Sequence, residues 1–451
     1  MIKPLPASLA LAFVYAMGQP LAARANTASD TASDIAALRA EMNTLRSTYE
    51  ARLQALEQRL QAAEKATAAP PGPAGPALPA AAMAPAAAAA NSSFNPALSL
   101  IVSGLYARTS QDPSRYRISG AALPVGAEAG PGTRGFSLAE TELGLSASVD
   151  PWWRGVAIIA LQPDDRVSVE EAYVQTTALG AGLTLKAGRF FSGLGYLNAQ
   201  HAHRWDFVDN PLAYQALLGT QYGDDGVQLT WLAATDQFIQ LGMELGRGRG
   251  FPGSDSSRNG AGMVALTAHT GGDLGTSHSW RAGLSVLNAK ASDQELADVD
   301  ALGNGITNVF SGRTRLWVAD AVWKWAPNGN AARTHFKLQG EWLRSTRSGN
   351  LVQDAGGLNQ AAPHHASLSG WYVQGVYQFM PAWRLGLRTE RLDPGNAYRP
   401  AKHSLMLDFG ASEFSRLRLQ LAQDHSRAGA ADRQVFLQYQ MSLGAHGAHG
   451  Y

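Results

Sequence analysis

The chain has 451 residues, with 37 lysines and arginines against 36 aspartates and glutamates, so its formal charge is close to zero. This balance excludes the broad basic footprint expected of a protein that binds nucleic acid or other polyanions over its whole surface. Cysteine is absent, which removes disulfides and thiolate metal sites and is compatible with an oxidising compartment.

Residues 1–25 have the pattern of a secretory signal peptide. Lys3 supplies the positive charge, residues 9–17 are apolar, and Ala23-Arg24-Ala25 forms a small-residue cleavage site, so we expect cleavage before Asn26. An uncleaved membrane anchor is the alternative, although the apolar run is short for one. No later stretch offers the roughly 18 uninterrupted apolar residues of a spanning helix.

Residues 26–65 are predicted to carry a coiled-coil oligomerisation helix. Within 31–65, Ile35, Leu38 and Met42 begin an apolar stripe at three- and four-residue spacing, and charged residues occupy the opposite face. A stripe this narrow needs a partner helix, although a helix lying on the rest of the protein is the alternative. The stripe does not distinguish a dimer from a trimer. Residues 66–96 are rich in alanine and proline and are predicted to form a semi-extended linker.

From residue 97 onward, connections of alternating length separate about sixteen segments of roughly 8–14 residues in which every second residue is apolar. Tight connections lie at 149–151, 179–182 and 379–381, and long ones lie at 110–134, 191–225 and 349–369. This alternation is typical of a membrane barrel with short periplasmic turns and long outer loops. We therefore predict that residues 97–451 form a 16-stranded antiparallel transmembrane β-barrel in the outer membrane of a Gram-negative bacterium, with the coiled coil in the periplasm.

The segments have the two faces that such a barrel needs. In the last one, Val435, Leu437 and Tyr439 alternate with a set that is polar except for Phe436. We expect the apolar set to face lipid and the polar set to face a wet lumen.

The third outer loop, 191–225, has an unusual composition. It is rich in apolar side chains, which implies that it packs against something, and the barrel interior is the available surface. In general porins with sixteen strands the loop at this position folds inward and narrows the pore, so we expect the same here. The polar and aromatic residues predicted to form this constriction are Tyr196, Arg204, Trp205, Asp206 and Asp209.

Charge on the predicted lumen face is unevenly distributed. The early segments contribute Glu140, Glu142 and Glu170, and the late segments contribute Lys324, Lys337, Arg384, Arg388, Arg416 and Arg418. These residues are expected to line the pore wall. The glutamates would then face the lysines and arginines across the lumen, and the resulting electric field would orient polar solutes. The alternative is that the charges only hydrate the channel and pair with one another.

Histidine provides a second candidate chemistry. His201 and His203 lie close to Asp206 and Asp209, and imidazole and carboxylate groups are reasonable zinc ligands. We therefore consider zinc as cargo or loop ligand, held by His201, His203 and Asp206. The spacing matches no structural zinc motif, and hydrogen-bonded loop histidines are the alternative. His364-His365 is expected in the sixth outer loop, and the chain ends in a tail with further histidines.

The sequence contains no motif for an enzyme. A nucleophile elbow, an HExxH helix and a phosphate-cradling glycine loop are all missing from it. No resident cofactor is expected.

Several stretches resemble a known group of proteins. Residues 185–191, 195–198, 201–209, 323–329, 375–380 and 441–449 are similar to proteobacterial outer-membrane barrels often labelled zinc-regulated or TonB-dependent receptors. The order of coil, linker and barrel also resembles the coiled-coil-bearing trimeric porins, which include phosphate- and dicarboxylate-type channels. The TonB label fits poorly, because nothing before residue 97 could form a folded plug domain.

The function predicted from these patterns is a passive porin for small hydrophilic solutes, constricted by residues 191–225. The resemblance implies a homotrimer embedded in outer-membrane lipid and lipopolysaccharide, and no nucleic-acid partner is expected. One alternative is a zinc-related uptake protein that binds metal or a metal complex through the histidines and aspartates of the constricting loop. An adhesive role of the outer loops is another.

Overall fold

The computed structural model describes residues 96–300, 302–395, 398–429 and 431–444. The predicted signal peptide, coiled coil and linker lie outside these residues. Within the described ranges, no helix combines the length and apolar character that a membrane crossing requires.

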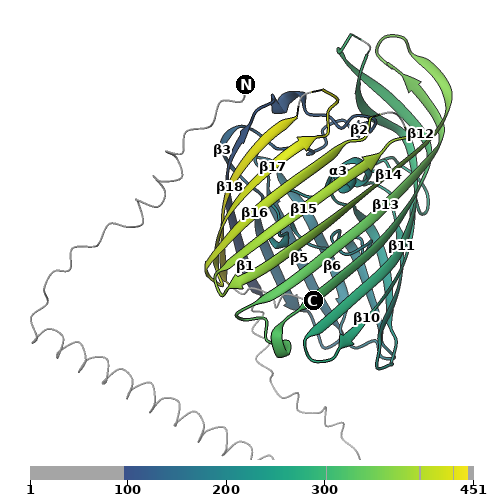
Figure 1. The fold of residues 1–451 in the computed structure, drawn as a ribbon. Coiled ribbons are helices and arrows are strands. Elements are labelled where there is room, and N and C mark those ends of the chain that lie inside the picture. Colours follow the sequence, from purple (N-terminus) through teal and green to yellow (C-terminus); the bar gives the residue numbers. More distant parts are fainter. Residues whose placement is uncertain (1–95, 301, 396–397, 430, 445–451) are drawn as a thin grey trace, which may run out of the picture. The chain divides into compact units, whose positions relative to one another are not determined.

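The described residues form a closed antiparallel β-barrel of sixteen wall strands, as predicted (Figure 1). The wall strands are β1 (Ala97–Thr109), β4 (Thr141–Ser148), β5 (Trp153–Leu161), β6 (Val167–Thr176), β7 (Leu183–Phe191), β8 (Gly223–Leu232), β9 (Phe238–Gly246), β10 (Met263–Leu274), β11 (His278–Val299), β12 (Gly305–Trp325), β13 (His335–Gln353), β14 (Gln360–Met380), β15 (Trp383–Asp393), β16 (Ala401–Ser412), β17 (Ser415–His425) and β18 (Asp432–Gly444). Because β1 pairs with both β4 and β18, the sheet closes and leaves no free edge.

The shorter elements belong to the connections. They are η1 (Pro113–Arg115), β2 (Leu123–Pro124), β3 (Gly135–Leu138), η2 (Ala202–Arg204), α3 (Leu212–Leu218) and η3 (Pro327–Gly329). Strand β3 precedes β4 and pairs with residues 104–107 of β1, so it extends the wall.

Alternation along the strands sorts side chains to the two faces of the wall. In β17, Leu419 is 38% exposed on the outside, whereas its neighbours Arg418 and Gln420 are 1% and 0% exposed on the inside. Strand β18 has the same pattern, with Leu437 outside and the buried Phe436 inside. The outer face is therefore an apolar band suited to lipid, and the prediction for the two faces is confirmed.

Of the three long connections predicted from the sequence, 110–134 and 191–225 are confirmed, but the prediction for 349–369 is wrong. Strands β13 and β14 continue through this stretch to a turn at 354–359, so that His364 and His365 lie in β14 rather than in a loop. This hairpin and the one formed by β11 and β12 rise beyond the neighbouring strands (Figure 1). A strand pair in water on both sides has no need of alternating apolar residues, so the sequence signal disappears there.

Two long connections fold inward at the same end of the barrel. Residues 110–134 leave β1 and cross to β11, where Leu123 of β2 pairs with Ala297. Residues 192–222, which connect β7 to β8 and are named the inward loop below, contribute much of the main apolar cluster. That cluster also contains inward-facing residues of the wall, among them Leu316 of β12 and Tyr372 of β14. The inward loop is therefore rich in apolar residues because it packs against the barrel interior.

Candidate functional site

The inward loop is a compact unit whose two ends are tied together by Asn198. The side-chain amide of Asn198 donates to the carbonyl oxygens of Ser192 at 2.8 Å and Tyr222 at 2.9 Å, and its oxygen accepts from the Tyr222 N–H at 2.8 Å. All seven residues of α3 are buried, and Gly219 ends the helix in the left-handed conformation that caps favour. The loop therefore has a defined structure inside the barrel.

Two aspartates of the inward loop face the basic sector of the wall, which is formed by Lys337, Arg384, Arg388 and Lys402. The carboxylate of Asp206 lies 2.5 Å from Lys337 Nζ and 3.4 Å from Arg384 Nη1. Asp209 accepts from Arg388 Nη2 at 2.7 Å and from Lys402 Nζ at 2.5 Å. These are strong charge-assisted contacts between the loop and strands β13, β15 and β16.

The environment of these aspartates favours their ionised forms. Burial alone would raise the pKa of Asp206, but the charges of Lys337 and Arg384 outweigh it and hold that pKa below its ordinary value. The pKa of Asp209 is lowered in the same way, because Lys402 and Arg388 outweigh the effect of burial.

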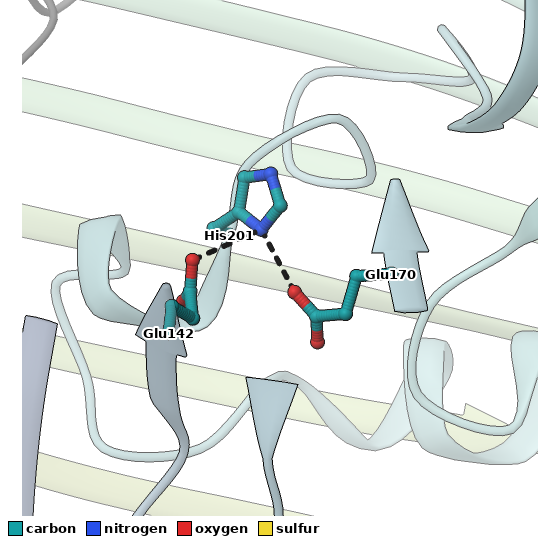
Figure 2. A group of neighbouring side chains, drawn as sticks. All are labelled: Glu142, Glu170 and His201. Carbon is teal, nitrogen blue, oxygen red and sulfur yellow. Dashed lines mark hydrogen bonds and ion pairs between the residues drawn. The ribbon is translucent and has the colours of Figure 1, made fainter. Parts of the chain in front are cut away.

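Two histidines of the inward loop face the acidic sector of the wall, which is formed by Glu142, Glu170 and Glu171. His201 Nδ1 lies 3.0 Å from Glu170 Oε2, and its Nε2 lies 2.9 Å from Glu171 Oε2. His203 Nδ1 lies 2.7 Å from Glu142 Oε1, and the two imidazole rings stack with their centroids 5.8 Å apart. Figure 2 shows His201 between Glu142 of β4 and Glu170 of β6. Burial alone would lower the pKa of His201, but hydrogen bonds to the two β6 glutamates outweigh it and raise that pKa well above its usual value.

A β-bulge allows two consecutive glutamates to reach His201. Between β5 and β6, Ile158 pairs with Glu171 and Ile159 pairs with Val169, so Glu170 is the extra residue. In a regular strand, neighbouring side chains point to opposite faces, whereas a bulge redirects one of them. Glu171 was not predicted to be a site residue, because strict alternation places it on the other face from Glu170.

Glu341 of β13 is a third anchor for the inward loop, and sequence reasoning missed it. Its carboxylate accepts from the backbone N–H groups of Tyr196 at 3.2 Å and Leu197 at 3.0 Å, and from the Tyr214 hydroxyl at 2.8 Å. Gly195 has a φ of +64°, and a Cβ at this position would lie 2.1 Å from Glu341 Oε2. Only glycine fits where the backbone approaches the carboxylate this closely.

A cavity of about 1250 Å³ lies between the inward loop and the short turns at the opposite end of the barrel. The loop contributes Tyr196, His203, Arg204 and Asp206, and the wall contributes Lys324, Lys337, Arg384, Asp408 and Arg416, among others. Asp273 and Glu413 line it near the short turns. The cavity is thus a charged vestibule beside the loop.

The structure divides the predicted pore-lining residues into two groups. Lys337, Arg384 and Arg416 line the vestibule. Arg388 and Arg418 are buried beneath the loop, where Arg418 donates to the Trp205 carbonyl oxygen at 2.8 Å. On the acidic side, Glu142 and Glu170 pair with the histidines, and Glu140 lies beside both of them. Many of the charged residues predicted to line the pore therefore bind the inward loop instead. The loop presents histidines to the wall glutamates and aspartates to the wall lysines and arginines.

The predicted zinc ligands are not brought together as a set. His201 and His203 are neighbours, but the carboxylate of Asp206 is occupied by Lys337, Arg384 and the Gln374 side-chain amide at 3.0 Å. The oxygens near the imidazoles come from wall glutamates instead.

Comparison with known proteins now identifies the family. Residues 160–397, more than half of the chain, match the family described as phosphate-selective porin O and P. The chain belongs to this family. It is therefore an outer-membrane porin, a β-barrel channel rather than an enzyme by its family and fold, and the resemblance to porins is confirmed. The zinc-regulated and TonB-dependent labels are not supported by these matches.

This porin is also similar to individual proteins, at identities below 30%. An uncharacterized protein of Aquifex aeolicus (strain VF5) is 29% identical over 344 residues, which cover 70% of this chain and 70% of that protein. Among solved structures, an anion-selective porin from Comamonas acidovorans is 10% identical with a TM-score of 0.48, covering 77% of this chain and 99% of the other. The channel DcaP of Acinetobacter baumannii is 13% identical with a TM-score of 0.45, covering 77% and 96%.

Proposed function

We propose that this porin is a passive channel for small anions, with the inward loop as its constriction. The observation that carries the proposal is the unequal exposure of cations and carboxylates at the vestibule. The side chains of Lys337, Arg384 and Arg416 are 19%, 24% and 19% exposed, whereas those of Asp206 and Asp408 are 6% and 1% exposed. A solute inside the vestibule meets the cations first.

This arrangement favours anions for an electrostatic reason. The carboxylates lie behind the cations and keep them in place, but their own field at the solute is weakened by the nearer positive charges. Guanidinium and ammonium groups also donate several hydrogen bonds to oxyanions. The acidic residues Asp273 and Glu413 lie nearer the short turns, outside this cationic region.

The family description makes inorganic phosphate the first solute to test. We also propose that the porin is a homotrimer, assembled through barrel walls and a coiled coil in residues 26–65, with 1–25 removed on export. The short turns and the coil would then face the periplasm, and the apolar band would contact lipid and lipopolysaccharide.

Reversal potentials across a planar bilayer with a salt gradient test the anion preference. We expect the purified porin to pass chloride and phosphate more readily than potassium, and Lys324→Glu to shift the reversal potential toward cation preference. Lys324 lines the vestibule and pairs in register with Lys337. The matched control is Lys290→Glu, which makes the same charge change at an exposed position of β11 that does not line the vestibule.

Equal passage of anions and cations by the unmodified porin would contradict the proposal. An equal shift in both variants would also contradict it, because the selectivity would then not arise in the vestibule. Phosphate would be supported as the solute if added phosphate lowered the conductance at concentrations where added chloride did not.

A further inference from the structure

The acidic sector and the inward loop together form a group of side chains with the chemistry of a metal site. Ligand atoms of Glu142, Glu170 and His201 all lie within 4.8 Å of one another (Figure 2). We propose that these three residues bind a divalent transition-metal cation, which fastens the inward loop to strands β4 and β6. This proposal is independent of the solute that the porin carries.

The distances between the ligand atoms suit a single cation. His201 Nδ1 lies 3.0 Å from Glu170 Oε2 and 3.4 Å from Glu142 Oε2. Zinc binds imidazole nitrogen and carboxylate oxygen at about 2.0–2.2 Å, so the ligand atoms of a tetrahedral site are about 3.3–3.6 Å apart. Small side-chain movements therefore suffice to place three protein ligands around one ion, with water completing the coordination.

Other polar atoms form hydrogen bonds that hold the proposed ligands in position. His201 Nε2 lies 2.9 Å from Glu171 Oε2, and the second oxygen of Glu142 lies 2.7 Å from His203 Nδ1. A neutral imidazole has one N–H, so donation from Nε2 to Glu171 leaves the Nδ1 lone pair for a metal ion. Carboxylates that orient a metal-bound histidine in this way are a regular feature of metal sites.

The charge of the cluster also favours a cation. Glu142, Glu170 and Glu171 surround two imidazoles, and the ion-pair partners seen for these carboxylates within the described ranges are His201 and His203. The side chains of Glu142 and Glu170 are only 3% and 11% exposed. Carboxylates withdrawn from water need positive charge beside them, and two imidazoles supply at most two positive charges for these three carboxylates.

The ligand types indicate which metals fit. One imidazole nitrogen with two carboxylate oxygens suits zinc, manganese, cobalt or nickel, whereas magnesium and calcium prefer oxygen ligands alone. Metal binding requires Nδ1 without its proton, so the cation takes the place of the proton that the carboxylates otherwise hold on the ring.

Calorimetric titration of the purified, EDTA-treated full-length porin with zinc chloride tests the proposal. We expect one zinc per chain, at least 100-fold weaker binding in His201→Ala, Glu142→Gln and Glu170→Gln, and a smaller loss in Glu171→Gln. Glu170→His keeps a ligand at the same place and should bind within about tenfold of the unmodified porin. The matched control is His364→Ala with His365→Ala, which removes two imidazoles from β14 outside the cluster.

Folding and coordination are checked on the same samples. Heat-modifiable mobility in gels reports the folded barrel for every variant, and cobalt absorption reports nitrogen and oxygen coordination. Absence of zinc binding to the folded porin would overturn the proposal. Undiminished binding in His201→Ala, or loss of binding in the His364/His365 control, would overturn it as well, because the metal would then lie elsewhere.

Discussion

His201 and Asp206 lie in one short stretch of the inward loop, and their side chains pair with different sectors of the barrel wall. His201 contacts Glu170 of β6, and Asp206 contacts Lys337 of β13. The sequence of the loop is therefore complementary in charge to the wall around it. Because the loop is held on both sides, its position in the channel is fixed by many contacts rather than by its ends alone.

Removal of the Asp209 carboxylate should loosen the basic side of this attachment. In Asp209→Asn, the buried Arg388 and Lys402 lose a shared anionic partner, and we expect the free energy of unfolding to fall by about 3 kcal/mol. Urea unfolding in detergent measures the change, and single-channel current should become noisier. The control is Asp393→Asn, whose pair with Arg399 is about half exposed and should contribute less than about 1 kcal/mol. Equal effects in the two variants would contradict the assigned role of Asp209.

A methyl group at Gly195 should displace the inward loop from Glu341. We expect Gly195→Ala to raise single-channel conductance, because its Cβ occupies space held by the carboxylate that binds the Tyr196 and Leu197 N–H groups. Gly180 is the matched control, since it also has a positive φ, +82°, but nothing within 4 Å of an added Cβ, and it does not line the vestibule. Gly180→Ala should cost about 1–2 kcal/mol of backbone strain and leave conductance unchanged. Unchanged conductance in Gly195→Ala would contradict this account of the loop.

Asn198 should be required for the closed shape of the inward loop. Asn198→Ala leaves the buried Tyr222 N–H and two carbonyl oxygens without their side-chain partner, and each unmade bond costs about 1–3 kcal/mol. We expect greater proteolysis between 192 and 222 and a lower free energy of unfolding. Asn288→Ala provides the comparison, because the Asn288 side chain accepts from Arg315 at an exposed site. Similar losses in both variants would show that Asn198 has no special role.

The basic side of the attachment should resist mild acid. The pKa of Asp206 is held below its usual value of 3.8 by Lys337 and Arg384, and that of Asp209 by Lys402 and Arg388, with Arg418 of β17 also near Asp206. A depressed carboxyl pKa stabilises the fold above about pH 4, and this stabilisation is lost as the pH falls through the lower value in the folded protein. The two ionised aspartates should therefore hold the loop from pH 7 to pH 4 and lose this effect below about pH 3, where channel noise should rise. In Asp206→Asn the noise should already be raised at pH 7, and equal noise in Asp206→Asn and the unmodified porin at pH 7 would contradict the assignment.

Some features of the site could be anticipated from the chain, and others could not. The apolar residues of 191–225 predicted a packed loop, and the alternation of strands predicted several of the charges that point inward, although not Glu341. The pairing of His201 with Glu171 was not predictable, because it depends on a bulge that breaks the two-residue period. The course of 110–134 toward β11 was missed as well, since two residues of β2 leave no recognisable strand pattern.

The sequence by itself determined the barrel, because an outer apolar face and an inner polar face require alternation at every second residue of each wall strand. Leu417, Arg418 and Leu419 show it in the chain as clearly as in the structure. Only the tertiary structure decided which charges meet. Contacts such as Asp209 with Lys402 join residues far apart in the chain, and no local pattern records the closure of the sheet that brings them together. That closure, with the inward loop packed inside it, brings charges from distant strands together as the loop attachment, the cationic vestibule and the cluster of imidazole and carboxylate groups around His201.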